Sequence, residues 1–222
     1  MSAATVVAID GPAGSGKSSV ARAVARALGF QFLDTGAAYR ALAWLVLEQG
    51  GDTGHEPTVI AALDALGTLE LTIDPTGQRV SIAGHDVTEA IRSERISAAV
   101  SGVARTLPAR EAVNVRFREI IAAADPGIVA EGRDITTVVA PDADVRVLLT
   151  ADEAVRIRRR FGDVGGDEHQ VGARLAARDA SDAKVVDFLT AADGVTVVDS
   201  TDLTFDETVE AIVRLVSEET HD

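Results

Sequence analysis

Cysteine is absent from the 222-residue sequence, and histidine is scarce. Without cysteine, thiol catalysis, disulfide bonds and zinc sites built from cysteine are excluded. The four histidines are scattered, mostly in polar segments, and we expect them to be solvated and to form neither a catalytic group nor a metal site: His55, His85, His169 and His221. Any chemistry must therefore depend on other side chains.

Positive charge is also in short supply. Lys plus Arg number 21 against 35 for Asp plus Glu, which gives a formal net charge of −14. A field of this sign repels polynucleotides and anionic lipid, so we expect no polynucleotide partner and no membrane partner. Any nucleotide must be held by local cation clusters. Only two of the basic residues are lysines, Lys17 and Lys184, and the planar fork of the many arginines suits phosphate contacts.

Long apolar runs are missing too. Residues 1–9 lack a basic segment, and the first apolar stretch stops at Asp10, too early for a signal peptide or a membrane span. There is no internal repeat and no low-complexity tract. The length suits one α/β domain, residues 1–222, with insertions. We expect a cytoplasmic protein and a monomer.

The most informative pattern is Gly-Pro-Ala-Gly-Ser-Gly-Lys-Ser at residues 11–18, which matches G-x-x-x-x-G-K-[ST]. It lies between an apolar run at 5–9 and a helical run at 18–28. In that context the glycines let backbone N–H groups turn toward phosphate oxygens, and the helix adds its positive N-terminal end. The alternative, a glycine-rich turn that binds nothing, fits this context poorly.

The pattern therefore predicts a site for a nucleoside triphosphate. Lys17 would reach the β and γ phosphates, and the Ser18 hydroxyl would be the ligand of Mg²⁺. The expected phosphate-binding residues are Gly11, Pro12, Ala13, Gly14, Ser15, Gly16, Lys17, Ser18 and Ser19.

Short β-type runs alternate with helical runs along the chain. The expected strands are 5–9, 31–33, 128–130, 145–149 and 195–198, and the expected helices are 18–28, 37–49, 109–123, 152–161 and 205–216. This alternation predicts an α/β, three-layer P-loop NTPase fold with a central parallel sheet. The last helix begins with a capping box, Thr204 with Glu207, and its apolar stripe should close the core: Phe205, Val209, Ile212, Val213 and Val216.

Two segments break this rhythm. Residues 69–73 and 79–83, on either side of Asp74-Pro75-Thr76-Gly77, predict an antiparallel hairpin. We expect an inserted subdomain at about 58–105. The Gly- and Asp-rich stretch 162–167 separates an arginine-rich helix from the helical run 169–178 and predicts a mobile lid at about 156–180.

The positions of the arginines help to distinguish among the classes of P-loop protein. GTPases carry N-K-x-D, which is absent, and motors or transporters would need more sequence. Small-molecule kinases surround two substrates with arginines, because phosphoryl transfer depends on positioning and charge stabilisation. Arg40 lies one turn into a helix, and Arg133 follows a strand. Two groups of arginines each share one face of a helix: Arg156, Arg159 and Arg160, and Arg174 and Arg178. Solvated surface arginines remain the alternative for Arg40 and for the lid helix.

Several segments together resemble the bacterial cytidylate kinases, which transfer a phosphate from ATP to CMP or dCMP. The carrying segments are 8–18, Leu-Asp-Thr-Gly-Ala-Ala-Tyr-Arg at 33–40, Val87 to Arg92, Glu-Gly-Arg-Asp at 131–134 with 137–139 and 141–143, and Arg178-Asp179 with Asp182. They span residues 8 to about 199. Each is weak alone, but the combination is specific.

The resemblance implies roles for individual residues. A cytosine reader needs a carboxylate for the exocyclic amine and donors for N3 and O2. By motif position Asp134 would accept from the amine, and Ser101 and Arg110 would contact the base edge. The implied CMP-binding residues are Thr35, Arg40, Ser101, Arg110, Arg133, Asp134, Arg178 and Asp182, and the implied catalytic residues are Lys17, Arg133, Arg159 and Arg178. Arg40, Arg133 and Arg178 would bind phosphate, and Asp182 would bind the sugar. The resemblance also implies that the inserted subdomain at about 58–105, with its hairpin at 69–83, binds the nucleoside monophosphate (NMP).

The chain also departs from the family pattern. Val185 stands where an arginine recurs, so either the adjacent Lys184 substitutes or one acceptor contact is missing. Val185, Val186, Phe188 and Leu189 suggest a local apolar cluster. Four further positions differ from the residues usual in the family: Ala38, Thr136, Ala140 and Phe117. We expect altered packing at the first three. A kinase for UMP, shikimate or dephospho-coenzyme A, and a nucleotide-binding regulator without turnover, remain the alternative functions.

Overall fold

The computed structural model describes residues 4–219 and divides into two compact units. Unit 1 comprises Met1–Phe32 and Ala124–Asp222, and unit 2 comprises Leu33–Ala123. Unit 2 contains the 58–105 segment and extends beyond it at both ends. That this segment binds the monophosphate stays a prediction.

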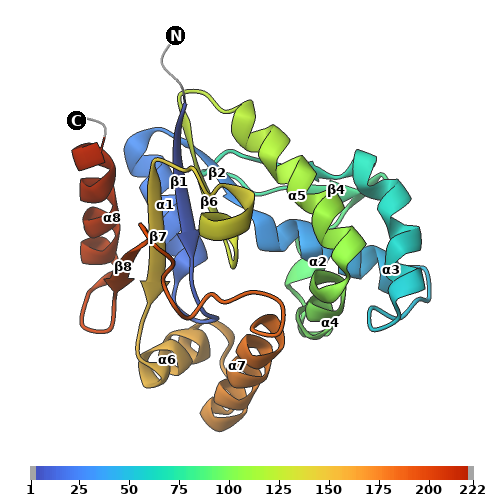
Figure 1. The fold of residues 1–222 in the computed structure, drawn as a ribbon. Helices are drawn as coiled ribbons and strands as arrows, with labels where there is room; N and C mark the ends of the chain where they lie inside the picture. Colours follow the sequence, from blue (N-terminus) through green and yellow to red (C-terminus); the bar gives the residue numbers. More distant parts are fainter. Residues whose placement is uncertain (1–3, 220–222) are drawn as a thin grey trace. The chain divides into compact units, whose positions relative to one another are not determined.

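The sheet that organises unit 1 has five strands in the order β2-β6-β1-β7-β8 (Figure 1). Their bounds are Thr5–Asp10 (β1), Gln31–Asp34 (β2, which runs into unit 2), Gly127–Gly132 (β6), Val145–Thr150 (β7) and Thr196–Asp199 (β8). β1 pairs in parallel with β6 and β7, so that Val7 lies opposite both Val129 and Val145, and β8 extends β7 in parallel. The predicted parallel sheet and α/β class are confirmed.

Four helices and one π-turn accompany these strands in the described part of unit 1: α1 (Lys17–Leu28), η3 (Ile135–Val139), α6 (Glu153–Val164), α7 (Glu168–Asp182) and α8 (Phe205–Glu219). The apolar stripes of α1 and α8 pack with the sheet in one core; Val24, Leu149 and Ile212 are fully buried there. In Figure 1, α6 and α7 lie beyond the carboxyl ends of β1 and β7. That edge is where open α/β sheets bind their ligands.

The ends of the helices confirm some details and correct others. The capping box is present, because the Thr204 N–H donates to Glu207 and the Glu207 N–H donates back to the Thr204 hydroxyl. Phe205, however, was expected in the core and is 50% exposed. It opens α8, ahead of the turns that reach the core.

The expected irregular stretch 162–167 is also shorter than predicted. α6 continues to Val164 and stops at Gly165, whose φ of 66° suits glycine and whose N–H donates to the Phe161 carbonyl. Asp167 then caps α7 by accepting from the Gln170 N–H. Only residues 165–167 connect the two helices, since a single glycine terminates α6 and a single aspartate starts α7.

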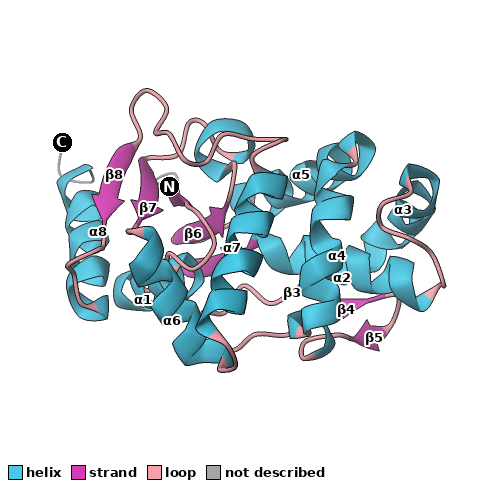
Figure 2. Cartoon of the chain, turned by 90° about the horizontal axis from the view of Figure 1, so that it is seen from below, coloured by secondary structure: helices cyan, strands magenta, loops and turns pink. Residues whose placement is uncertain are grey.

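Unit 2 is mainly helical. Its elements are α2 (Thr35–Glu48), α3 (Glu56–Ala62), η1 (Leu63–Thr68), β3 (Glu70–Leu71), β4 (Val80–Ile82), β5 (His85–Asp86), η2 (Ala90–Arg92), α4 (Glu94–Arg105) and α5 (Leu107–Ala122). The predicted hairpin is confirmed by the antiparallel pairing of Glu70 with Ser81. The sequence missed β5, which makes a third strand (Figure 2), because two residues carry no periodicity.

Candidate active site

The phosphate loop connects the end of β1 at Asp10 to the start of α1 at Lys17. Gly14 and Gly16 have φ of 77° and 85°, the left-handed region that glycine adopts without strain. A Cβ at Gly14 would lie 2.8 Å from the Arg156 carbonyl oxygen. The first N–H groups of α1 have no intrahelical partner and are therefore available to an anion.

Lys17 lies on this loop, half-buried, with its Nζ 3.2 Å from the Pro12 carbonyl to which it donates. Burial and the nearby guanidinium of Arg133 lower the pKa of Lys17 to about 7, and the carboxylate of Glu131 opposes this shift. A bound polyphosphate would favour the charged ammonium, since an opposite charge raises the pKa of an amine.

Next to it, the Ser18 hydroxyl donates to Glu131 Oε1 at 2.7 Å. Glu131 is buried near the end of β6, the strand beside β1. From the sequence, Glu131 was named only as part of the Glu-Gly-Arg-Asp motif. Its position as a carboxylate at the end of a buried strand beside the phosphate loop was the signal that could have identified it as a site residue.

The oxygens of Ser18 and Glu131 suit Mg²⁺, which prefers hard oxygen ligands and is commonly held by one or two protein groups plus substrate phosphates. Among residues 4–219 there is no group of three or more His, Cys, Asp or Glu side chains that could hold a metal by themselves. This donor set therefore fits an ion that arrives with a nucleotide.

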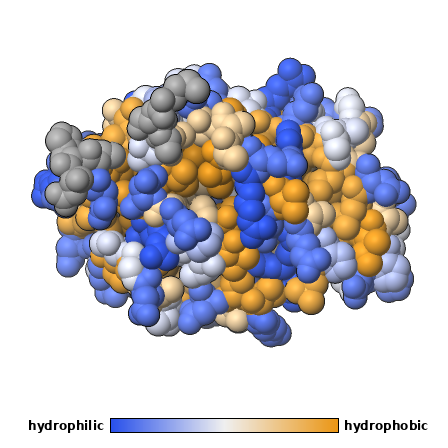
Figure 3. Space-filling view, turned by 45° about the horizontal axis from the view of Figure 1, so that its top comes forward, coloured by the Kyte–Doolittle hydropathy of each residue, from blue (hydrophilic) through white to orange (hydrophobic). Residues whose placement is uncertain are grey.

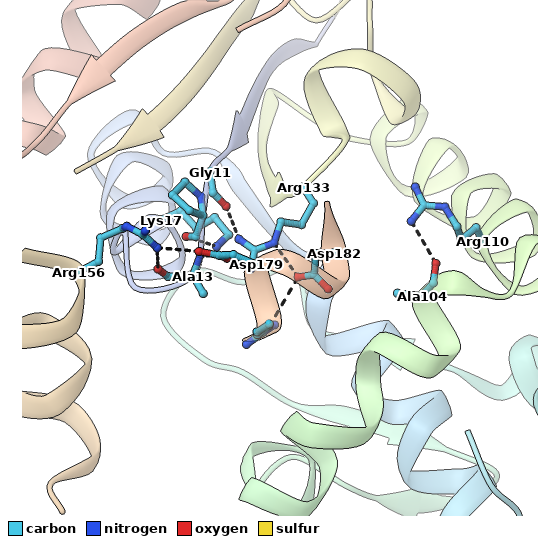
Figure 4. Close-up of polar contacts among 11 residues, drawn as sticks. Gly11, Ala13, Lys17, Ala104, Arg110, Arg133, Arg156, Asp179 and Asp182 are labelled. Atoms are coloured by element: carbon cyan, nitrogen blue, oxygen red, sulfur yellow. Dashed lines mark hydrogen bonds and ion pairs between the residues drawn. The ribbon is translucent and has the colours of Figure 1, made fainter. Parts of the chain in front are cut away.

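Arg133 lies at the centre of a cluster of charges beside the loop (Figure 4). Its Nε donates to Asp182 at 3.0 Å, its Nη2 to Asp179 at 3.4 Å, and its Nη1 to the Gly11 carbonyl. The guanidinium also stacks 4.6 Å from the ring centre of the buried Phe188. Arg178 lies 3.8 Å from Asp182 through its Nε. Three predicted site residues, Arg133, Arg178 and Asp182, are thus brought together.

Two arginines of α6 donate to backbone carbonyls of the phosphate loop. Arg156 donates to the Ala13 carbonyl and to Asp179, at 2.8 and 2.7 Å. Arg159 donates to the Ser15 carbonyl at 3.3 Å and to the carbonyl and hydroxyl of Ser200 at 2.7 and 2.9 Å.

Arg160, which sequence spacing placed on the same face, behaves differently. Its side chain is 42% exposed and lies 3.9 Å from Asp163, within its own helix. A shared face at spacing i, i+3, i+4 is broader than the part of it that meets the loop, so for Arg160 the structure agrees with the alternative of a solvated surface arginine.

Asp10, at the end of β1, supports the segment that carries Arg133 and Asp134. Its carboxylate accepts from the Ile135 N–H, the Thr136 N–H and the Thr136 hydroxyl, at 2.9, 2.8 and 2.6 Å. Burial raises the pKa of Asp10, and these hydrogen bonds oppose the shift. Thr136, expected only to alter packing, therefore has a defined polar role. Asp134 is buried directly before η3.

The other predicted acceptor residues belong to unit 2. Asp34 caps α2 by accepting from the Ala37 N–H at 2.9 Å, and its second oxygen accepts from Arg40 at 2.9 Å and Gln78 at 3.1 Å. Thr35 is buried in the first turn of α2, and Ser101 lies half-buried on α4. Arg110, on α5, donates to the Ala104 carbonyl at 3.3 Å (Figure 4).

The segment after α7 corrects one expectation. Lys184 is exposed, Phe188 is buried, and Leu189 is 58% exposed. The proposed apolar cluster therefore does not include Leu189. The reason is that the Asp187 carboxylate accepts from the N–H groups of Leu189 and Thr190, which turns the chain.

On the face drawn in Figure 3, hydrophilic and hydrophobic side chains are interspersed. Within residues 4–219, every helix is too short or too polar to cross a membrane.

Comparison with known proteins agrees with the sequence motifs. The family model for cytidylate kinase matches residues 7–218. The chain is 48% identical over 214 residues to a cytidylate kinase of Cutibacterium acnes, covering 95% of each protein, and 42% identical over 213 residues to that of Streptomyces griseus, covering 95% of this chain and 92% of the other. A Thermus thermophilus crystal structure shares the fold, with a TM-score of 0.51, 22% identity and 98% of each chain covered. The chain belongs to the cytidylate kinase family.

Proposed function

We propose that this protein transfers the γ-phosphate of ATP to CMP or dCMP, giving ADP and CDP or dCDP. Family membership makes it an NMP kinase acting on CMP. The observation that carries the finer proposal is the arrangement of unit 1. There a complete phosphate loop with Lys17 lies beside Arg133, whose guanidinium is bonded to the loop and to two carboxylates of α7.

Positioning accounts for the chemistry. The acceptor phosphate is already an anionic nucleophile at neutral pH, so no general base is needed. The loop N–H groups and Lys17 would bind the β and γ phosphates, and Lys17 would follow the charge of the migrating group. Arg133, Arg159 and Arg178 would offset the charge that two polyanions bring together. Arg159 acts here through the carbonyl of Ser15, the contact it makes in the structure.

Ser18 would be the protein ligand of Mg²⁺, and the ion supplies positive charge that offsets the negative charge of the phosphates. Glu131 accepts a hydrogen bond from the Ser18 hydroxyl, which leaves the oxygen lone pairs of Ser18 for the ion.

Recognition of CMP would depend on carboxylates for the amine and the sugar and on arginines for the phosphate. Asp134 would accept from the cytosine amine, Ser101 and Arg110 would contact the base edge, and Asp182 would bind the sugar. Thr35, Arg40, Arg133 and Arg178 would bind the monophosphate. The bond from Arg40 to Asp34 supports this assignment, because it holds the guanidinium at the start of α2. Segments 58–105 and 156–180 would serve as the NMP-binding subdomain and the lid.

The test is ADP release from ATP with a panel of acceptors: CMP, dCMP, UMP, shikimate and dephospho-coenzyme A. We expect turnover with CMP and dCMP, dependence on Mg²⁺, and little turnover with the others. Preferred turnover of another acceptor would contradict the substrate assignment, and binding of ATP without turnover would favour a regulator. We also propose a monomer working in the cytoplasm, for which the sedimentation coefficient of the purified protein tests the oligomeric state.

A further inference from the structure

Asp179 is a buried carboxylate of α7 to which no catalytic or binding role has been assigned so far. Only 8% of the residue is exposed. Burying an ionised carboxylate is costly unless it is paired and hydrogen-bonded. Asp179 meets that condition with three donors from three separate segments of unit 1: the phosphate loop, the end of β6 and α6. Figure 4 shows it among them.

The first donor is the phosphate loop itself. The Ala13 N–H donates to Asp179 Oδ1 at 2.8 Å, although the two residues are 166 positions apart. The carbonyl of the same residue accepts from Arg156 at 2.8 Å. Both backbone polar groups of Ala13 are therefore fixed by the two helices that follow β7, and the loop conformation depends on where those helices lie.

The other two donors are guanidinium groups. Arg156 donates to Oδ2 at 2.7 Å, and Arg133 donates to Oδ1 at 3.4 Å. Two like charges held close together repel each other, and the shared carboxylate offsets that repulsion. Asp182, three residues further along α7, bonds to Arg133 and lies 3.8 Å from Arg178.

We infer that Asp179 is a positioning residue for phosphoryl transfer, holding Arg133 and Arg156 in fixed register with the phosphate loop. This inference rests on the proposed kinase activity. Asp179 acts through these groups and is not a catalytic residue. A misplacement of catalytic groups by about 1 Å can cost a factor of about 100 in rate, so the carboxylate governs kcat more than the binding of either substrate.

Asp179→Asn is the first variant. Asparagine keeps the size but replaces one acceptor oxygen with an NH₂ donor, which would face a donor in a site where all three neighbours donate. We expect kcat to fall about 30- to 100-fold, with the Michaelis constants for ATP and CMP changing less than about 3-fold. Asp206→Asn in α8, an exposed carboxylate outside every proposed binding segment, is the matched control and should leave kcat unchanged. Asp179→Ser is the second variant if the asparagine form does not fold.

A double-mutant cycle separates positioning from a merely structural role. Asp179→Asn, Arg156→Gln and the double variant are compared with the unmodified chain in kcat and in thermal midpoint. If Asp179 acts through Arg156, the loss of kcat caused by Asp179→Asn shrinks at least about 5-fold in the Arg156→Gln background. Additive losses of kcat, or a fall in thermal midpoint with kcat preserved, would overturn the inference.

Turnover of CMP by the unmodified chain is measured first, so that failure of the proposed function is recognised separately. If no acceptor is turned over, the proposed function has failed, and the positioning role for phosphoryl transfer falls with it. If the unmodified chain turns over CMP, a kcat for Asp179→Asn within about 3-fold of the unmodified value overturns the positioning role alone.

Discussion

Arginines in the two units are held in different ways. In unit 2, Arg40 pairs with Asp34, six residues earlier, at the start of the same helix. In unit 1, Arg133 bonds to partners 46, 49 and 122 positions away, on α7 and on the phosphate loop. The exposed fractions of the two side chains are similar, 19% and 14%. The difference is therefore one of connectivity: Arg40 is placed by its own helix, whereas Arg133 is placed only when distant segments have assembled.

This contrast teaches which substitutions should be severe. A group with several distant partners links the elements that carry them, so its removal disturbs more than one bond. A group with a local partner can be replaced at the cost of that contact. Four sets of substitutions, in order of decreasing expected loss, test whether residues with distant partners matter more than residues with local ones.

Lys17→Ala deletes the charge that, in the proposed function, follows the migrating phosphoryl group. We expect kcat to fall by about 10³-fold or more, by analogy with other cationic contacts in phosphoryl transfer. The measurement is ADP release with CMP, and a thermal midpoint close to that of the unmodified chain serves as the folding control. Retained activity in a folded variant would disprove the assignment of the phosphate loop.

A matched pair, Arg133→Lys and Arg40→Lys, tests the comparison directly. Lysine has a single donor head, so at position 133 it cannot keep the bonds to Asp179, Asp182 and the loop together. We expect kcat/KM for CMP to fall about 100-fold for Arg133→Lys and about 10-fold for Arg40→Lys, the value of one charged hydrogen bond. Equal losses would show that connectivity does not matter.

Asp134→Asn should alter acceptor choice rather than ATP use. A neutral amide loses the charge-assisted bond to the cytosine amine and can present its own donor to that donor. We expect the preference for CMP over UMP to weaken about 10- to 150-fold, corresponding to about 1.5–3 kcal/mol. Kinetic constants for both acceptors measure this effect. If kcat/KM falls equally for CMP and UMP, Asp134 is structural.

Lys184→Ala should be nearly silent, because Lys184 is exposed just after α7. We expect the Michaelis constant for CMP to change less than about 2-fold. Val185→Arg, by contrast, should restore a contact that the family commonly has and tighten the binding of CMP by about 1.5–3 kcal/mol. Steady-state kinetics on both variants show whether Lys184 substitutes for the family arginine or whether that contact is missing. A large rise in the Michaelis constant for CMP in Lys184→Ala would mean that this lysine replaces the missing arginine.

What could be predicted from the sequence follows the same division between local and distant contacts. The phosphate loop, the capping box at Thr204 and the strands of the parallel sheet are encoded by neighbouring residues, and the structure contains all of them. The bond between Ala13 and Asp179 was not predictable, because a motif does not say which distant side chain it will meet. The burial of Phe188 beneath Arg133 is of the same kind.

Errors arose where a pattern was broader than the contact it implied. Phe205 belongs to the apolar periodicity of α8 yet lies at its exposed first turn, and Leu189 belongs to the apolar run after α7 yet is 58% exposed. In the candidate site, the roles of Asp10 and Glu131 were missed because each belongs to a motif in which only the neighbouring residues were assigned a role. A carboxylate at the end of a buried strand is a signal in its own right.

The scarcity of lysine, combined with the lowered pKa of Lys17, has a practical consequence for chemical labelling. Because its pKa is lowered to about 7, Lys17 loses its proton more readily near neutral pH than an ordinary exposed lysine does. Only the unprotonated amine attacks an acylating reagent. A short exposure to such a reagent near neutral pH should therefore modify Lys17 in preference to Lys184, and nucleotide binding should protect it. The chain thus carries its own reporter of nucleotide occupancy, readable by mass spectrometry without engineering a tag.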